Sequence, residues 1–98
     1  MKFEFVFTEH ADEQMDVLEK NKDKRAVFNA VSKILGYMET NLRHPSLNTH
    51  KYDAIGGPNK EDVFESYVQN KTPGAYRIFW HYGPGKGMIT ILEVSHHP

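Results

Sequence analysis

The chain begins with alternating hydrophobic and polar residues. In residues 2–7, KFEFVF, three phenylalanines alternate with lysine, glutamate and valine, a pattern that predicts a β-strand. Thr8 follows as a predicted helix N-cap. Ala11, Met15 and Leu18 then recur every three to four residues, as expected for one face of a helix. This part of the chain therefore predicts a strand followed by a helix of about three turns.

A second helix is predicted from about residue 24 to residue 39. Its apolar stripe has the clearest helical period in the chain and comprises Val27, Val31, Ile34, Leu35 and Met38. Asn41 is a suitable C-cap residue, and Pro45 prevents the helix from continuing. An amphipathic helix of this kind needs a surface to cover, and a sheet supplies one.

The rest of the chain predicts mainly strands. Residues 42–61 are irregular, with strand character around 50–54, and Val63–Gln69, Ala75–Tyr82 and Met88–Val94 are three strand signals. Turn residues at 72–74 and 83–87 separate them. The order β-α-α-β-β-β predicts a single α+β domain over residues 1–98. Its sheet is expected to have four mostly antiparallel strands, with both helices packed on one face.

The strand at 75–82 predicts two sheet faces of different character. One face places Ile78 and Trp80 in the core, beneath Val31, Ile34 and Leu35. Two tyrosines share that face, Tyr76 and Tyr82. The other face is predicted to be open and to bear Arg77, Phe79 and His81. A mixture of cationic and aromatic side chains on an open face favours ligand binding.

Composition excludes several kinds of site. There is no cysteine, so disulfides, thiolate metal sites and a cysteine nucleophile are all excluded. The six histidines do not fall at metal-ligand spacings, and no metal or other cofactor is expected. Charge enters the N-terminal segment at Glu4, and no apolar run is long enough to span a membrane, so we expect a cytoplasmic protein. The formal net charge of −1 is unusual for a nucleic-acid-binding protein.

Three segments resemble the RelE/ParE family of bacterial toxins. GAYRIFWHY is similar to the family strand in which an arginine follows an aromatic residue. LNTHKY is similar to the basic stretch after the second helix, and MITILEVSHHP closes with histidine just past the last strand. The predicted element order also matches, so the resemblance covers nearly the whole chain. It implies the fold and, for the ribonuclease members, cleavage of mRNA without metal, usually on the ribosome.

Residue by residue, the resemblance implies a site for attack of a ribose 2′-hydroxyl on the adjacent phosphate. Arg77 matches the arginine that contacts phosphate, and Lys51 the basic residue after the second helix. His96 matches a C-terminal histidine, with a proton-transfer role, and His97 stands where members have tyrosine. Glu65 is a further candidate, either as a base or to orient Arg77. A base, an acid and cations are what this reaction needs.

Each assignment has a structural alternative. Arg77 is also suited to a cross-strand salt bridge with Glu65. The predicted RNA-binding residues are His50, Lys51, Arg77, Phe79 and His81. His81 is equally suited to an exposed strand position, and Lys51 to an ordinary solvated position. His96 and His97 are also consistent with a solvated chain end. Variants of Arg77 and His96 are expected to fold normally, because one residue lies on an open face and the other near a chain end.

Two functional classes remain. The first is an mRNA endoribonuclease that an antitoxin protein neutralises, with mRNA and the ribosome as its other partners. The second is a binding protein of the same fold without nuclease activity, such as a ParE-like inhibitor of DNA gyrase. The acidic balance favours the second class, as do Glu93 and Val94 near positions where many members carry arginine. The candidate residues favour the first class.

Overall fold

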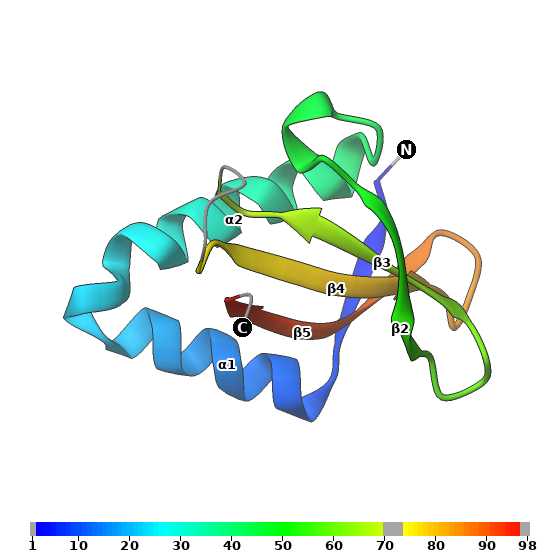
Figure 1. The fold of residues 1–98 in the computed structure, drawn as a ribbon, viewed down its shortest axis with the longest axis horizontal. Helices are drawn as coiled ribbons and strands as arrows, with labels where there is room; N and C mark the ends of the chain where they lie inside the picture. The colour runs from blue at the N-terminus through cyan, green and yellow to red at the C-terminus, as the bar shows by residue number, and fades with distance from the viewer. Residues whose placement is uncertain (1, 70–73, 97–98) are drawn as a thin grey trace.

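The computed structural model describes residues 2–69 and 74–96 (Figure 1). Its helices are α1 and α2 and its strands β1 to β5, with two short 3₁₀ helices, η1 and η2. Their bounds along the chain are β1 Glu4–Phe7, α1 Glu9–Lys20, η1 Lys22–Lys24, α2 Arg25–Thr40, η2 Pro45–Leu47, β2 His50–Gly56, β3 Asp62–Tyr67, β4 Tyr76–Tyr82 and β5 Met88–His96. The predicted turn at 72–74 lies largely outside the described residues.

The sheet has five strands in the order β1-β5-β4-β3-β2. β1 runs parallel to β5, and the other neighbours are antiparallel, so the predicted α+β fold with a mostly antiparallel sheet is confirmed. The predicted count of four strands is wrong, because β2 is a full strand. It is an edge strand in which only Tyr52 is even partly buried. A strand exposed on both sides has no alternating pattern from which it can be predicted.

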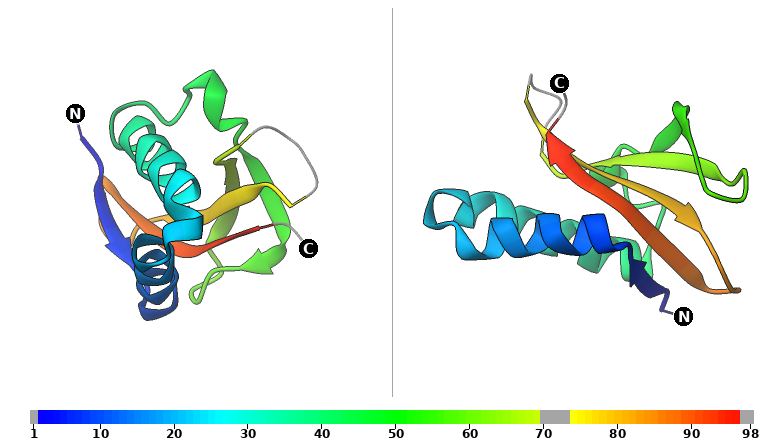
Figure 2. Two further views of the ribbon diagram at one scale, coloured as in Figure 1. Left: turned by 90° about the vertical axis from the view of Figure 1, so that its left-hand side faces the viewer. Right: turned by 90° about the horizontal axis from the view of Figure 1, so that it is seen from below.

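Both helices lie on one side of the sheet (Figure 2). Thr8 caps α1 as predicted, its hydroxyl accepting a hydrogen bond from the backbone N–H of Ala11. We call the sheet surface under the helices the helix face. Its core includes the predicted residues, with Ile78 and Trp80 fully buried beside Val31, Ile34 and, at the margin, Leu35.

A buried polar chain ties the start of β2 to this core. The Trp80 indole N–H donates to the Ser66 hydroxyl at 2.9 Å, and that hydroxyl lies 2.7 Å from the Thr49 hydroxyl. The Trp80 indole and the Ser66 and Thr49 hydroxyls thereby each have a partner, which avoids the cost of leaving them unsatisfied. Thr49 directly precedes His50, the first residue of β2. The hydrogen bonds from Trp80 through Ser66 to Thr49 therefore also fix the point where β2 begins.

A β-bulge at Leu92 changes the alternation of β5. Ile89 and Ile91 face the core, and the next core residue is Val94, three positions on rather than two. One extra residue in a strand reverses the face of every residue beyond it. Consequently Ser95 pairs with Arg77, whereas His96 pairs with Tyr76 on the helix face.

The other sheet surface, here called the Arg77 face, is not open as predicted. Phe79 is 7% exposed and His81 is 3% exposed. β2 runs steeply across the direction of β3 and β4 (Figure 1), and the Tyr52 ring packs edge-on against Phe79 at 5.0 Å. Because the sheet is strongly twisted, its edge strand β2 turns over the Arg77 face and covers part of it. Tyr82, expected in the core, is 51% exposed near the end of β4.

Replacement of Ile34 by alanine tests the helix packing. Ile34 is 5% exposed within the core. The variant is expected to lose about 2–4 kcal/mol of unfolding free energy, from lost burial and the cavity that remains. Urea unfolding followed by Trp80 fluorescence measures this loss. Ile55→Ala is the matched control: Ile55 is 41% exposed, so a change within about 0.5 kcal/mol is expected. Equal effects would contradict the packing described.

Candidate active site

Three strands bring the side chains of His50, Glu65 and Arg77 together on the Arg77 face. Register places His50 of β2 opposite Glu65 of β3, and Tyr67 of β3 opposite Arg77 of β4. The His50 Nε2 lies 2.6 Å from one Glu65 oxygen, and the Arg77 Nη1 lies 2.7 Å from the other. The cross-strand salt bridge that the sequence left open as an alternative for Arg77 is therefore present.

Glu65 is the centre of this cluster. Its side chain is only 2% exposed, and each carboxylate oxygen has one cationic or hydrogen-bonding partner. A buried carboxylate is tolerated when it is paired in this way. Both oxygens are occupied and shielded, so Glu65 is placed to orient Arg77 and His50 rather than to contact a substrate itself.

Both ring nitrogens of His50 face acceptors. Nε2 faces the Glu65 carboxylate, and Nδ1 lies 3.1 Å from the backbone oxygen of Asn48. Only the doubly protonated imidazolium donates to both at once. Asn48 has φ +46°, a left-handed conformation that asparagine tolerates well, and this turn aims its carbonyl at His50. The His50 side chain is 47% exposed, so it remains reachable from solvent.

Arg77 is held from two sides. Its guanidinium carbon lies 4.5 Å from the centre of the Tyr67 ring, a cation–π arrangement, while Nη1 binds Glu65. The side chain is 12% exposed. Its Nε is buried and has no hydrogen-bond partner within residues 2–69 and 74–96. A buried N–H without a protein partner is uncommon in folded proteins.

Phe79 and His81 share this face but are enclosed by the fold. Phe79 lies under Tyr52, and the His81 Nδ1 lies 2.7 Å from the carbonyl oxygen of Tyr82. Neither side chain presents a free surface to a ligand in this conformation. Their predicted RNA-binding role stays a prediction.

Lys51 and His96 lie apart from Arg77. The Lys51 ammonium is 3.6 Å from Asp53 and 3.5 Å from Asp62, so two carboxylates already surround its charge. His96 is exposed and meets the Tyr76 ring edge-on at 5.7 Å on the helix side. The structure therefore does not bring either residue to Arg77. His97 lies outside the described residues.

Sequence analysis missed two contributors to the site, Tyr67 and Asn48. Strand alternation offered a signal for Tyr67, which lies two positions after Glu65 and so on the same face. Asn48 had no comparable signal, because its role depends on a backbone turn that only the structure reveals.

Charge is unevenly distributed along the chain. α1 contains five acidic residues and one lysine, a formal charge of −4 with histidine neutral. Since the whole chain carries −1, the rest of it carries +3. The acidic residues on α1 are Glu9, Asp12, Glu13, Asp16 and Glu19, all of them exposed. The overall acidity that counted against nucleic-acid binding is thus concentrated on one helix.

Glu61 makes the β2–β3 loop sensitive to acid. Hydrogen bonds from its own backbone N–H and from that of Asn59 lower the pKa of its carboxyl below the ordinary 4.5. Because the folded pKa is depressed, this stabilisation is present above pH 4.5 and is lost as pH falls through the folded value. We expect Glu61→Gln to unfold more readily than wild type at pH 6 but not at pH 2.5, as measured by urea titration. An equal difference at both pH values would contradict the assignment.

Neither a metal site nor a membrane-spanning helix is found among the described residues. In the described ranges, no group of three or more histidine, aspartate or glutamate side chains is arranged to hold a metal ion. Nor does any helix of the described chain have the length and apolarity needed to cross a membrane.

Comparison with known proteins identifies the fold. No protein-family model and no curated protein matches the chain. A YoeB/ParE toxin from Agrobacterium tumefaciens superposes with a TM-score of 0.71 at 4% identity, covering 97% of this chain and 99% of the other. The YoeB dimer from Staphylococcus aureus superposes with a TM-score of 0.65 at 13% sequence identity, covering 100% of both chains. A chain of the archaeal RelE–RelB complex from Pyrococcus horikoshii OT3 superposes with a TM-score of 0.65 at 12% sequence identity, covering 98% of this chain and 96% of that one. The chain has the fold of RelE, YoeB and ParE toxins.

Proposed function

We propose that this protein is a RelE-like toxin that cleaves mRNA without a metal ion and that an antitoxin protein neutralises in the cytoplasm. The observation that carries the proposal is the way in which the Arg77 side chain is held on the sheet. The Glu65 carboxylate and the Tyr67 ring fix this side chain, 12% of which remains exposed. A guanidinium held in place is suited to contact phosphate.

The reaction has simple requirements. The ribose 2′-oxygen bonds to phosphorus as the bond to the 5′-oxygen breaks, one proton leaves the 2′-hydroxyl and another is added to the 5′-oxygen. Arg77 would stabilise the charge that gathers on the phosphate oxygens. His50 lies on the same face, its Nε2 is 2.6 Å from the Glu65 carboxylate and its side chain is partly exposed, which makes it the better placed proton donor. His96, the donor that the resemblance implies, lies on the opposite face at the end of β5.

Charge distribution supports a polyanionic substrate. Outside α1 the chain carries a formal charge of +3, and positive charge attracts RNA over distances of about one Debye length, roughly 10 Å at 0.1 M salt. Substrate binding is then expected to weaken as salt concentration rises.

The test is cleavage of mRNA by the purified protein, on translating ribosomes and on free mRNA, with EDTA present. We expect cleavage on ribosomes, fragments ending in a cyclic phosphate, and no effect of EDTA. The Glu65→Gln/Arg77→Met double variant is the inactive control. Absence of cleavage in both formats would remove the endoribonuclease proposal.

The second candidate is a binding protein without nuclease activity, such as a gyrase inhibitor. Lys51 favours it, because Asp53 and Asp62 already neutralise that charge. Inhibition of gyrase supercoiling by a wild-type protein that cuts no mRNA would establish this function in place of the first.

A further inference from the structure

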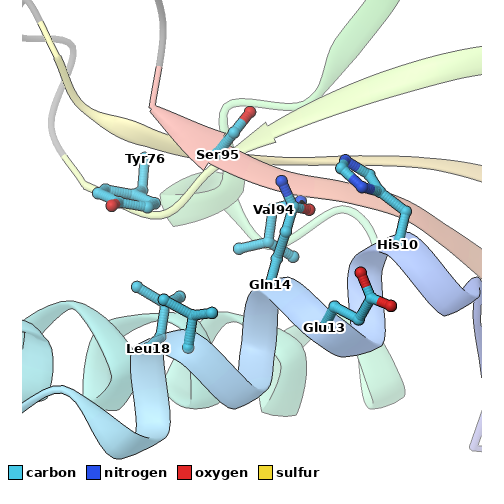
Figure 3. Close-up of a pocket in the computed structure, with 8 residues that line it drawn as sticks. His10, Glu13, Gln14, Leu18, Tyr76, Val94 and Ser95 are labelled. Carbon is cyan, nitrogen blue, oxygen red and sulfur yellow. Dashed lines mark hydrogen bonds between the residues drawn. The ribbon is translucent and has the colours of Figure 1, made fainter.

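A groove lies between α1 and β5, and its lining includes Tyr76 of β4 and Ser95, the cross-strand partner of Arg77. Its volume is about 340 Å³. Figure 3 shows an apolar end, formed by Leu18, Tyr76 and Val94, and a polar end near His10, Glu13 and Ser95. The polar end is partly paired internally, since Glu93 accepts a hydrogen bond from Ser95 and lies 3.6 Å from His10. The apolar end is therefore the part that offers unused binding surface.

The groove exists because β1 is short. β1 pairs with Met88–Ile91 only, so beyond Ile91 the edge of β5 is bordered by α1 instead of a strand. The Gln14 side-chain oxygen accepts the Val94 backbone N–H at 2.7 Å, and the Thr8 hydroxyl donates to the Leu92 carbonyl. These contacts cap the edge groups that an added strand would use. An occupant of the groove must therefore enter with a side chain rather than pair as a strand.

The α1 side of the groove is acidic, whereas at its Tyr76 end the Lys24 ammonium lies 5.9 Å from the centre of the Tyr76 ring. α1 carries a formal charge of −4, and Glu13 lies in the groove lining itself. Val17, at the apolar end, is 63% exposed, the largest fraction of any large apolar side chain in the described chain. An apolar patch with an acidic border disfavours RNA, whose phosphates are repelled, and favours lysine or arginine beside an apolar group.

We propose that this groove binds a basic peptide segment of a protein partner. One large apolar side chain of the segment fills the space over Val17, Leu18 and Val94, while flanking lysines or arginines face the carboxylates of α1. The volume is near the lower end of the range for small-ligand pockets, about 300–1,000 Å³, which suits one anchoring side chain. The inference does not depend on cleavage of mRNA.

The probe is the blocked peptide Lys-Lys-Trp-Lys-Lys, titrated into ¹⁵N-labelled protein at low salt. We expect shifts of the Val94 backbone amide and the Gln14 side-chain amide, and little change at Glu65 and Arg77. Two control peptides separate the contributions. Replacing Trp by Gly, or the four lysines by glutamates, is expected to weaken binding about tenfold or more, since anchor and charge each contribute.

Protein variants test the same contacts. Val17→Ser is expected to weaken binding about five- to tenfold without unfolding the helix, since Val17 is exposed. Glu13→Gln with Asp16→Asn is expected to reduce the salt dependence. Ile55→Ser, an exposed apolar residue on β2, is the matched control and should change nothing.

Four outcomes would overturn the proposal. The first is that the peptide shifts neither the Val94 nor the Gln14 signal, and the second is that the glycine peptide binds as tightly as the tryptophan peptide. The third is that single-stranded oligouridine shifts these signals more than the peptide does. The fourth is that the signals shift with protein concentration alone, without peptide. The last would show that a second copy of this chain occupies the groove. Because the readout is binding, failure here leaves the endoribonuclease proposal standing, and loss of that proposal leaves this one.

Discussion

Replacing Arg77 with methionine is expected to lower the unfolding free energy by about 3–5 kcal/mol, because the change leaves the Glu65 carboxylate buried without its main cation. The Glu65 side chain is 2% exposed, and the His50 ring would be its remaining polar partner. Chemical unfolding at pH 7, followed by circular dichroism, measures the loss. The sequence predicted that Arg77 variants fold normally, because it placed Arg77 on an open sheet face. That premise is wrong, since the Arg77 side chain is only 12% exposed.

A double variant separates the ion pair from simple packing. In Glu65→Leu with Arg77→Met, no buried charge is left unpaired, so stability is expected to recover most of the loss. Lys51 offers the matched control. It is 54% exposed and also ion-paired, so Lys51→Met is expected to change stability by about 1 kcal/mol or less. An Arg77→Met effect no larger than the Lys51→Met effect would refute the structural role of the pair.

Replacing His50 with glutamine is expected to lower the rate of mRNA cleavage by about 10²–10⁴-fold and to remove one limb of the pH–rate profile. Glutamine still donates a hydrogen bond to Glu65 but cannot transfer a proton at neutral pH, so the fold is kept and the chemistry is lost. Cleavage on ribosomes, measured across pH with stability checked separately, is the assay.

His96→Gln is the matched comparison. A large loss with a changed pH profile for His96→Gln, and none for His50→Gln, would move the proton-transfer role to the end of β5. RNA would then have to pass around that end to reach Arg77 as well. Arg77→Lys completes the set. It keeps the positive charge but loses the planar fork, and a rate loss of about 10²–10³-fold with an unchanged pH profile is expected.

The sequence predicted the parts of the fold that depend on local periodicity. Both helices, the Thr8 cap and the core positions Ile78 and Trp80 follow from spacings within about 20 residues, and the structure confirms them. β2 was only partly predicted, because an exposed edge strand is defined by its neighbour rather than by its own pattern. The cover over Phe79 arises from sheet twist, which has no local sequence signal.

The predicted site was divided by one residue. A hairpin paired without interruption from Tyr82 and Ile89 would place His96 on the same face as Arg77. The extra residue at Leu92 reverses this and sends His96 to the helix face. The sequence does contain a sign of this bulge, the three-residue spacing between the core residues Ile91 and Val94. That spacing can be recognised only when the core-facing positions of β5 are already known.

The parallel pairing of β1 with β5 has a consequence for how the protein is made. Phe5 pairs with Ile89, and β5 stands between β1 and the rest of the sheet. During synthesis, a chain that lacks residues 88–96 has no neighbour for β1 in this sheet, and α1 lacks the strand edge on which Gln14 and Thr8 rest. Contacts so distant in sequence form late and slowly. A ribosome that is still translating β5 therefore carries an unfinished domain, in which β1 and α1 lack their neighbour in the sheet.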